Sequence, residues 1–99
     1  MSDIDNNIEK IKAICDQHKV SKLFVFGSVL TNSYKKYSDI DFVVDFKDID
    51  IYNYADNYFD FKKSLEELLN REVDLLEEKA IKNPYLKKNI ESSKKLVYG

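Results

Sequence analysis

The segment 39–46 constrains the fold more than any other part of this chain. Its residues alternate strictly between two sides, with Ile40, Phe42, Val44 and Phe46 on one and Asp39, Asp41, Val43 and Asp45 on the other. Alternation with period two is typical of a half-buried β-strand. On such a strand Asp39 and Asp41 project from the same face. Because adjacent carboxylates repel each other unless a cation lies between them, the pair predicts a cation site, such as one for a divalent ion that bridges phosphates.

The remaining elements are read from hydrophobic periodicity and from turn residues. Helical spacing predicts helices over 3–18 and 53–70, and Asn83-Pro84 predicts the start of a last helix that runs toward Leu96. Strands are predicted over 22–26 and 72–77, an exposed loop over 47–52, and a short helical turn followed by a loop over 28–37. Strands that alternate with helices predict one α/β (α+β) domain over residues 1–99, with a short mixed sheet of three or more strands and helices mainly on its Phe42/Val44 face.

Composition narrows the possible functions. The 99 residues suit one small domain, and the 43% hydrophobic and 34% charged residues are typical of a globular protein. A formal net charge of −2 argues against a broad nucleic-acid surface. With Cys15 and His18 as the only residues of their types, neither an internal disulfide nor a histidine-based metal site is expected. The lack of a long apolar run and the acidic N-terminus predict no membrane span and a cytoplasmic location.

Three carboxylates are candidates for one site. The Asp-x-Asp pattern occurs three times, but only Asp39/Asp41 begins a buried-type strand with Gly27-Ser28 upstream. Asp74 lies on the predicted strand 72–77, opposite the face of Val73 and Leu75. If the two strands are neighbours, Asp74 is a base toward an attacking hydroxyl or a further metal ligand; the alternative is an exposed position on an edge strand. Gly27 and the amides after it favour contact with phosphate oxygens, although Gly-Ser is also a common turn.

A resemblance to a known family rests on these same residues. Phe26-Gly27-Ser28, followed after a gap by Ser38-Asp39-Ile40-Asp41-Phe42, resembles the nucleotidyltransferase domain of the DNA polymerase beta superfamily. The small size is similar to that of its minimal nucleotidyltransferase (MNT) branch, and Val73-Asp74-Leu75 fits the third-acid strand of the family. The resemblance spans nearly the whole chain and implies the nucleotidyltransferase fold.

The resemblance also implies a reaction. In such proteins a nucleoside triphosphate binds with magnesium, an acceptor attacks the α-phosphate, and pyrophosphate leaves. Transferred residue by residue, Gly27, Ser28 and Ser38 would hold the nucleotide. Asp39 and Asp41 would hold two Mg²⁺ ions, and Asp74 would complete the catalytic and metal site. Many MNT proteins are antitoxins that transfer AMP from ATP to a tyrosine of a HEPN-type ribonuclease toxin, so the resemblance implies this activity, this partner and a homo- or hetero-oligomer.

One departure from the family keeps a second function open. The family often follows Gly-Ser with an alanine-arginine-glycine segment, where this chain has Leu30, Thr31 and Asn32. The missing arginine favours the alternative of a weakly active or inactive binding module that neutralises its partner by complex formation. An Asp-x-Asp sugar transferase fits less well, because a domain this small leaves little room for a sugar-nucleotide site. Tyr52 and Phe59 fall off the core stripe of their predicted helix and are candidates for a partner interface.

Overall fold

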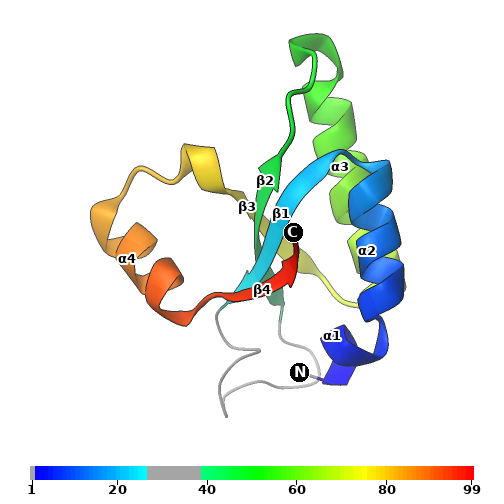
Figure 1. Ribbon diagram of the computed structural model, residues 1–99, viewed down its shortest axis with the longest axis horizontal. Coiled ribbons are helices and arrows are strands. Elements are labelled where there is room, and N and C mark those ends of the chain that lie inside the picture. Colours follow the sequence, from blue (N-terminus) through cyan, green and yellow to red (C-terminus); the bar gives the residue numbers. More distant parts are fainter. Residues whose placement is uncertain (1, 27–38) are drawn as a thin grey trace.

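A four-stranded mixed sheet forms the centre of the computed structural model, which describes residues 2–26 and 39–99 (Figure 1). The strand order is β3-β2-β1-β4. β1 (Val20–Phe26) is antiparallel to β2 (Ile40–Phe46) on one side and to β4 (Lys95–Tyr98) on the other. β3 (Val73–Glu77) extends the sheet as a parallel partner of β2. The predicted α/β fold with a short mixed sheet is therefore confirmed.

The long helix α3 (Ile51–Leu69) connects the two parallel strands. Parallel neighbours need a crossover connection, and a helix usually supplies it. The helix begins two residues earlier than the sequence predicted, within the expected loop 47–52, because the Asp50 carboxylate accepts a hydrogen bond from the Tyr52 amide at 3.0 Å and caps the first turn. Asn70 ends the helix in the left-handed conformation (φ 53°, ψ 43°), a common helix termination.

The main core lies between the sheet and two helices. α2 (Ile8–Gln17) and α3 cover the face of β2 from which Phe42 and Val44 project (Figure 1). Phe42, Phe61 and Leu65 are fully buried there, and the apolar residues of both strands and helices join one cluster. The predicted covering of the Phe42/Val44 face by helices is confirmed for α2 and α3.

The opposite face of the sheet is covered over part of its area. α4 (Pro84–Ser93) lies on the other side of the sheet from α2 and α3 (Figure 1). Val43 is 1% exposed and shares its surroundings with Ile90 of α4. The prediction of a half-buried β2 is therefore wrong at its centre, because α4 and the short 3₁₀ helix η2 (Glu78–Ala80) flank the second face as well.

The predicted helix over 3–18 is divided into α1 (Ser2–Asn6) and α2 by a turn at Asn7. Asn7 has φ −115° and ψ 13°, and its amide donates to the Ile4 carbonyl at 3.2 Å. Asparagine competes with helical hydrogen bonding and favours such turns. The prediction of a single helix in this region is thus wrong, because the turn at Asn7 separates two helices.

The last helix ends earlier than predicted, and a fourth strand takes its place. The Ser92 and Ser93 hydroxyls both donate to the Asn89 carbonyl at 2.9 Å, and Lys94 is extended (φ −68°, ψ 146°). Serine side chains that bond back to the helix weaken its continuation. The chain then pairs with β1 as β4. The predicted helical turn and loop over 28–37 lie outside the described residues, and no helix within 2–26 and 39–99 is long and apolar enough to cross a membrane.

Candidate active site

Two of the predicted carboxylates lie opposite each other on neighbouring strands. Asp41 of β2 and Asp74 of β3 are Cα partners in the parallel register, and we call them the acidic pair. Neighbouring strands are about 4.8 Å apart, and residues in register project from the same face. That face is the one turned away from Phe42 and Leu75, both buried in the main core. The predicted convergence of Asp41 and Asp74 is thus present in the backbone pairing.

Asp39 lies directly before β2, on the side where the acidic pair is found. The next residue, Ile40, donates its amide hydrogen to the Glu72 carbonyl at 3.1 Å. This bond ties the entry of β2 to the entry of β3. Asp39 is exposed, whereas Asp41 is half-buried. The three carboxylates therefore occupy one end of the β2/β3 pair, with Asp41 between the other two.

The electrostatics of Asp41 reflect this arrangement. Burial raises the pKa of Asp41 above its usual value, and the negative charges of Asp74 and Asp39 raise it further. A carboxylate next to other carboxylates holds its proton more tightly, because its charged form is repelled. The ionised form of Asp41 is therefore held at a cost that a bound cation would remove.

The donor set fits magnesium through two ligands. Within residues 2–26 and 39–99, no three His, Cys, Asp or Glu side chains lie close enough to form a preassembled metal site. Mg²⁺ in nucleotide sites is usually held by one or two carboxylates, with phosphate oxygens and waters completing the octahedron. Asp39 and Asp41, two residues apart at one end of β2, offer two such carboxylates, and Asp74 lies in register with Asp41 as a further oxygen donor.

The strand β1 leads directly to the acidic pair. Phe26, the last residue of β1, is the Cα partner of Asp41 on the side away from β3. Gly27 is the next residue in the chain. The predicted nucleotide-binding residues Gly27, Ser28 and Ser38 lie outside the described residues. Both described ends that flank 27–38, at Phe26 and Asp39, are at the acidic end of β2.

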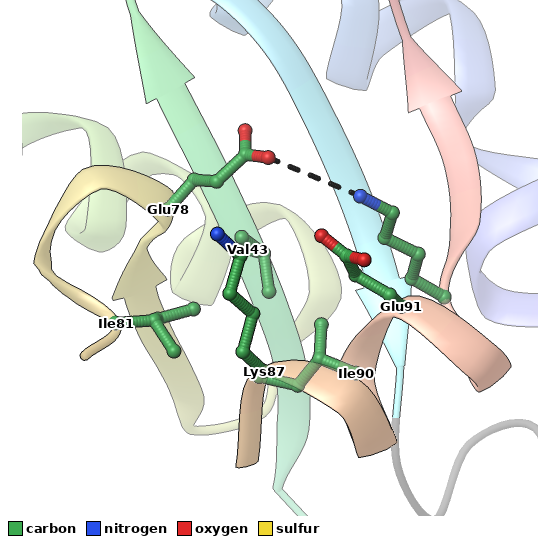
Figure 2. A pocket seen from close by; sticks show the side chains of 7 residues that line it. Val43, Glu78, Ile81, Lys87, Ile90 and Glu91 are labelled. Carbon is green, nitrogen blue, oxygen red and sulfur yellow. Dashed lines mark ion pairs between the residues drawn. The ribbon is translucent and has the colours of Figure 1, made fainter. Parts of the chain in front are cut away.

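A pocket lies farther along the same face, between β2, η2 and α4. Figure 2 shows Val43 at its base, with Ile81, Ile90 and the acidic and basic side chains of Glu78, Lys87 and Glu91 around it. Val43 is two residues from Asp41 on the same face of β2. The pocket therefore adjoins the acidic pair.

Lys94 is a residue of this face that sequence reasoning missed. Its ammonium pairs with the Glu78 carboxylate at 3.9 Å, the ion pair drawn as a dashed line in Figure 2, and lies 4.1 Å from the centre of the Phe24 ring. A lysine at the end of a helix is a common pattern favoured by the helix dipole, so its sequence position gave no signal of a site. Only the packing of α4 against the sheet brings Lys94 to this face.

Comparison with known proteins decides the family. The sequence model of the nucleotidyltransferase domain matches residues 8–97, which include all three carboxylates. The chain belongs to the nucleotidyltransferase domain family. Like other members of this family, it is therefore assigned to the nucleotidyltransferases as an enzyme class.

Relatives of this nucleotidyltransferase domain cover nearly its full length. A protein of Methanocaldococcus jannaschii named "Putative protein adenylyltransferase MJ0128" is 37% identical over 99 residues, which cover 99% of this chain and 96% of that protein. Among solved structures, one described as a minimal nucleotidyltransferase superposes with a TM-score of 0.76 at 25% identity, and the match covers 92% of this chain and 89% of the other.

Two further structures with the same fold are toxin–antitoxin complexes. One is the complex of the tri-AMPylated HEPN toxin of Shewanella oneidensis with MNT antitoxin. A chain of this complex matches with a TM-score of 0.67 at 23% identity, and the match covers 97% of this nucleotidyltransferase and 72% of that chain. A toxin–antitoxin complex with AMP-PNP matches with a TM-score of 0.73 at 23% identity, covering 94% and 73% of the two chains. The predicted nucleotidyltransferase family is confirmed by the family match, and these neighbours show that antitoxin complexes share its fold.

The other residues singled out in the sequence have structural roles or face solvent in this nucleotidyltransferase. Cys15 is fully buried in the core, and His18 donates from Nδ1 to the Ile14 carbonyl at 2.7 Å and packs against Phe61. Tyr52 and Phe59 of α3 are 89% and 62% exposed. The two aromatics that fall off the core stripe are therefore open to a partner.

Proposed function

We propose that this chain is a magnesium-dependent protein adenylyltransferase that transfers AMP from ATP to a tyrosine of a HEPN-type toxin and so acts as its antitoxin. The observation that carries the proposal is the pairing of Asp41 with Asp74, next to Asp39. The naming of the M. jannaschii relative and the AMPylated toxin complex support protein as the acceptor. Residues 1–99 would act as one minimal nucleotidyltransferase domain, in the cytoplasm, where ATP and Mg²⁺ are both available.

In this reaction the acceptor oxygen replaces pyrophosphate at the α-phosphorus. The tyrosine hydroxyl oxygen forms a bond to the α-phosphorus, and the bond from that phosphorus to the bridging oxygen breaks. The bond electrons leave with pyrophosphate, and the hydroxyl proton passes to a carboxylate. Bound magnesium would neutralise the negative charge that develops on the phosphate oxygens.

The residues of the site divide these roles. Asp39 and Asp41 hold the metal, because they come from one strand end and project from one face. Asp74 completes the metal site or accepts the hydroxyl proton; its position on the neighbouring strand supports either role. Gly27, Ser28 and Ser38 bind the triphosphate through the segment that joins β1 to β2.

The partner would dock on exposed apolar side chains of this chain. Tyr52 and Phe59 are both on α3, and buried aromatic anchors dominate the energy of many interfaces. The resulting assembly is a hetero-oligomer of antitoxin and toxin, as in the complexes that share this fold.

A second function is favoured by one observation, the absence of the family's arginine. Leu30, Thr31 and Asn32 stand where the family often has alanine, arginine and glycine. In this alternative the chain neutralises its partner by binding alone, with weak or no catalysis.

One experiment tests the proposal and separates the alternative. The purified chain is incubated with the HEPN-type partner, ATP and Mg²⁺, and the intact mass of the partner is measured. We expect the mass of one or more adenylyl groups to be added, and the Asp41→Asn variant to lower the rate roughly 100-fold or more.

Asp45→Asn is the matched control, since Asp45 lies on the same face of β2 but pairs with Lys79 at 3.7 Å. This control variant is expected to keep the wild-type rate. Full transfer by Asp41→Asn would overturn the assigned site. Toxin neutralisation without ATP and without any mass change would favour the binding module.

A further inference from the structure

Lys94 is a partly buried cation on the face of the sheet that carries the acidic pair. Its side chain is only 21% exposed, although it lies at the junction of α4 and β4 near the end of the chain. The ammonium lies 4.1 Å from the centre of the Phe24 ring, a cation–π contact. This contact fixes the charge above β1 instead of leaving it free in solvent.

The register of the sheet relates Lys94 to the acidic pair. Phe24 of β1 is the Cα partner of Val43, and Phe26 is the Cα partner of Asp41. Two residues along a strand span roughly 6.6 Å. Phe24, whose ring the ammonium overlies, is therefore one such step from the row that contains Asp41 and Asp74, on the same face.

The contact of Lys94 with Glu78 is easily exchanged. The two charged groups are 3.9 Å apart, and Glu78 is 36% exposed. Charge-assisted hydrogen bonds are usually 2.7–2.9 Å long, so this ion pair lacks a direct hydrogen bond of normal length. A phosphate oxygen with a higher charge density at hydrogen-bond distance would compete well for the same ammonium.

We propose that Lys94 is a phosphate-binding residue of the nucleotide site, exchanging Glu78 for a phosphate of ATP when the nucleotide binds. This inference rests on the proposed function for the position of the phosphates beside Asp41. A triphosphate with one Mg²⁺ still carries net negative charge, which the three carboxylates repel. Lys94 supplies a cation from the C-terminal part of the chain, at a site that lacks the arginine often found after Gly-Ser in this family.

The test compares three variants by calorimetric titration with Mg²⁺ and ATP. Lys94→Met keeps a long side chain that can pack on Phe24 but removes the charge, and we expect ATP affinity to fall roughly tenfold or more. Lys94→Arg is expected to restore affinity to near the wild-type value. Lys95→Met, an exposed neighbour on β4, is the matched control and is expected to bind ATP normally.

Glu78→Gln separates binding from a structural role. If the Lys94–Glu78 pair only stabilises the fold, loss of either partner has the same effect. Phosphate binding by Lys94 instead predicts that Glu78→Gln binds ATP as tightly as wild type or more tightly, because the ammonium is released. Wild-type affinity in Lys94→Met, or equal losses in Lys94→Met and Glu78→Gln, would overturn the proposal.

The same titrations distinguish this proposal from the transfer activity. ATP binding that depends on Lys94, without AMP transfer to the partner, would support Lys94 and contradict the proposed reaction. AMP transfer by a wild-type protein whose ATP affinity does not depend on Lys94 would support the reaction and overturn the role of Lys94. A wild-type chain that binds no ATP would overturn both.

Discussion

Asp41 and Asp74 are partners in the parallel register of β2 and β3, so two carboxylate residues lie side by side on neighbouring strands. Like charges at such positions destabilise a sheet. Carboxylates that would bind a metal therefore lower the free energy of unfolding when no metal is bound. Measurements of the free energy of unfolding can thus test the site.

Asp41→Asn is expected to stabilise the protein at neutral pH in the absence of metal. Burial and the charges of Asp74 and Asp39 raise the pKa of Asp41 in the folded protein. A carboxyl group whose pKa is raised on folding does not destabilise the protein at low pH, because it is protonated in both the folded and the unfolded state. It lowers the free energy of unfolding as the pH rises from the unfolded value of about 4 through the folded value.

The gain from Asp41→Asn should be less than about 1 kcal/mol at pH 7, because the group is partly solvated, and it should vanish below about pH 4. Urea unfolding at several pH values measures it. Asp48→Asn, an exposed loop acid, serves as the control and should show no such gain. A loss of stability in Asp41→Asn at pH 7 would contradict the electrostatic account.

Mg²⁺ is expected to stabilise the wild type but not the Asp41→Asn variant. A ligand that binds only the folded state raises the free energy of unfolding by RT ln(1 + [L]/Kd), which is about 2.7 kcal/mol at 100 times Kd. Thermal melts should show that Mg²⁺ raises the melting temperature of the wild type and leaves that of Asp41→Asn unchanged. Na⁺ at matched ionic strength is the control for screening, and an equal response of both proteins to Mg²⁺ would argue against metal binding by Asp41.

Much of this site could be predicted from the sequence, because its geometry follows from strand periodicity. The alternation over 39–46 correctly placed Asp41 on the face away from Phe42, and Asp39 lies at the same end of the strand. The sequence placed Asp74 on a strand of its own and left open whether the two strands are neighbours. The structure shows that they are parallel neighbours joined by the α3 crossover, which brings Asp74 next to Asp41. Local patterns were sufficient here since Asp41 and Asp74 lie on regular strands and Asp39 directly precedes one.

The parts that could not be predicted depend on contacts distant in sequence. Lys95–Tyr98 is too short to indicate a strand by itself, and it becomes one by pairing with β1. The burial of Val43 follows from the packing of α4, and so does the position of Lys94 above Phe24. Hydrophobic periodicity describes one element at a time, and it did not indicate that α4 covers the second face of β2 as well.

Asn83→Ala is expected to destabilise the protein through α4. The Asn83 Oδ1 accepts hydrogen bonds from the amides of Tyr85 and Leu86 at 2.9 and 3.2 Å, and Pro84 occupies the first turn. Loss of such a cap typically costs about 1 kcal/mol. Urea unfolding measures the change, with Lys82→Ala as the exposed neighbouring control. A change no greater than that of the control would contradict the capping role.

Tyr52→Ala and Phe59→Ala should affect a partner without affecting the fold. Both side chains are mostly exposed, so each substitution is expected to change the free energy of unfolding by about 0.5 kcal/mol or less. Binding to the HEPN-type partner, measured by calorimetry, should weaken roughly fivefold or more for an anchor residue. Lys63→Ala, on α3 and also exposed, is the control. Unchanged affinity in both aromatic variants would remove this surface from the proposed interface.

Cys15 is expected to be inert toward thiol reagents in the folded protein. Its side chain is fully buried in α2, and burial raises the pKa of the thiol to about 12. Reaction requires the thiolate and access to it, and the native state provides neither at pH 7 to 8. Labelling with an aromatic disulfide reagent should therefore be slow in buffer and rapid in concentrated guanidinium chloride. Labelling in buffer then requires the structure to open around α2. The labelling rate of the Asn83→Ala variant therefore shows whether loss of the α4 cap promotes that opening. Rapid labelling of the wild type in buffer would show that α2 does not protect this thiol.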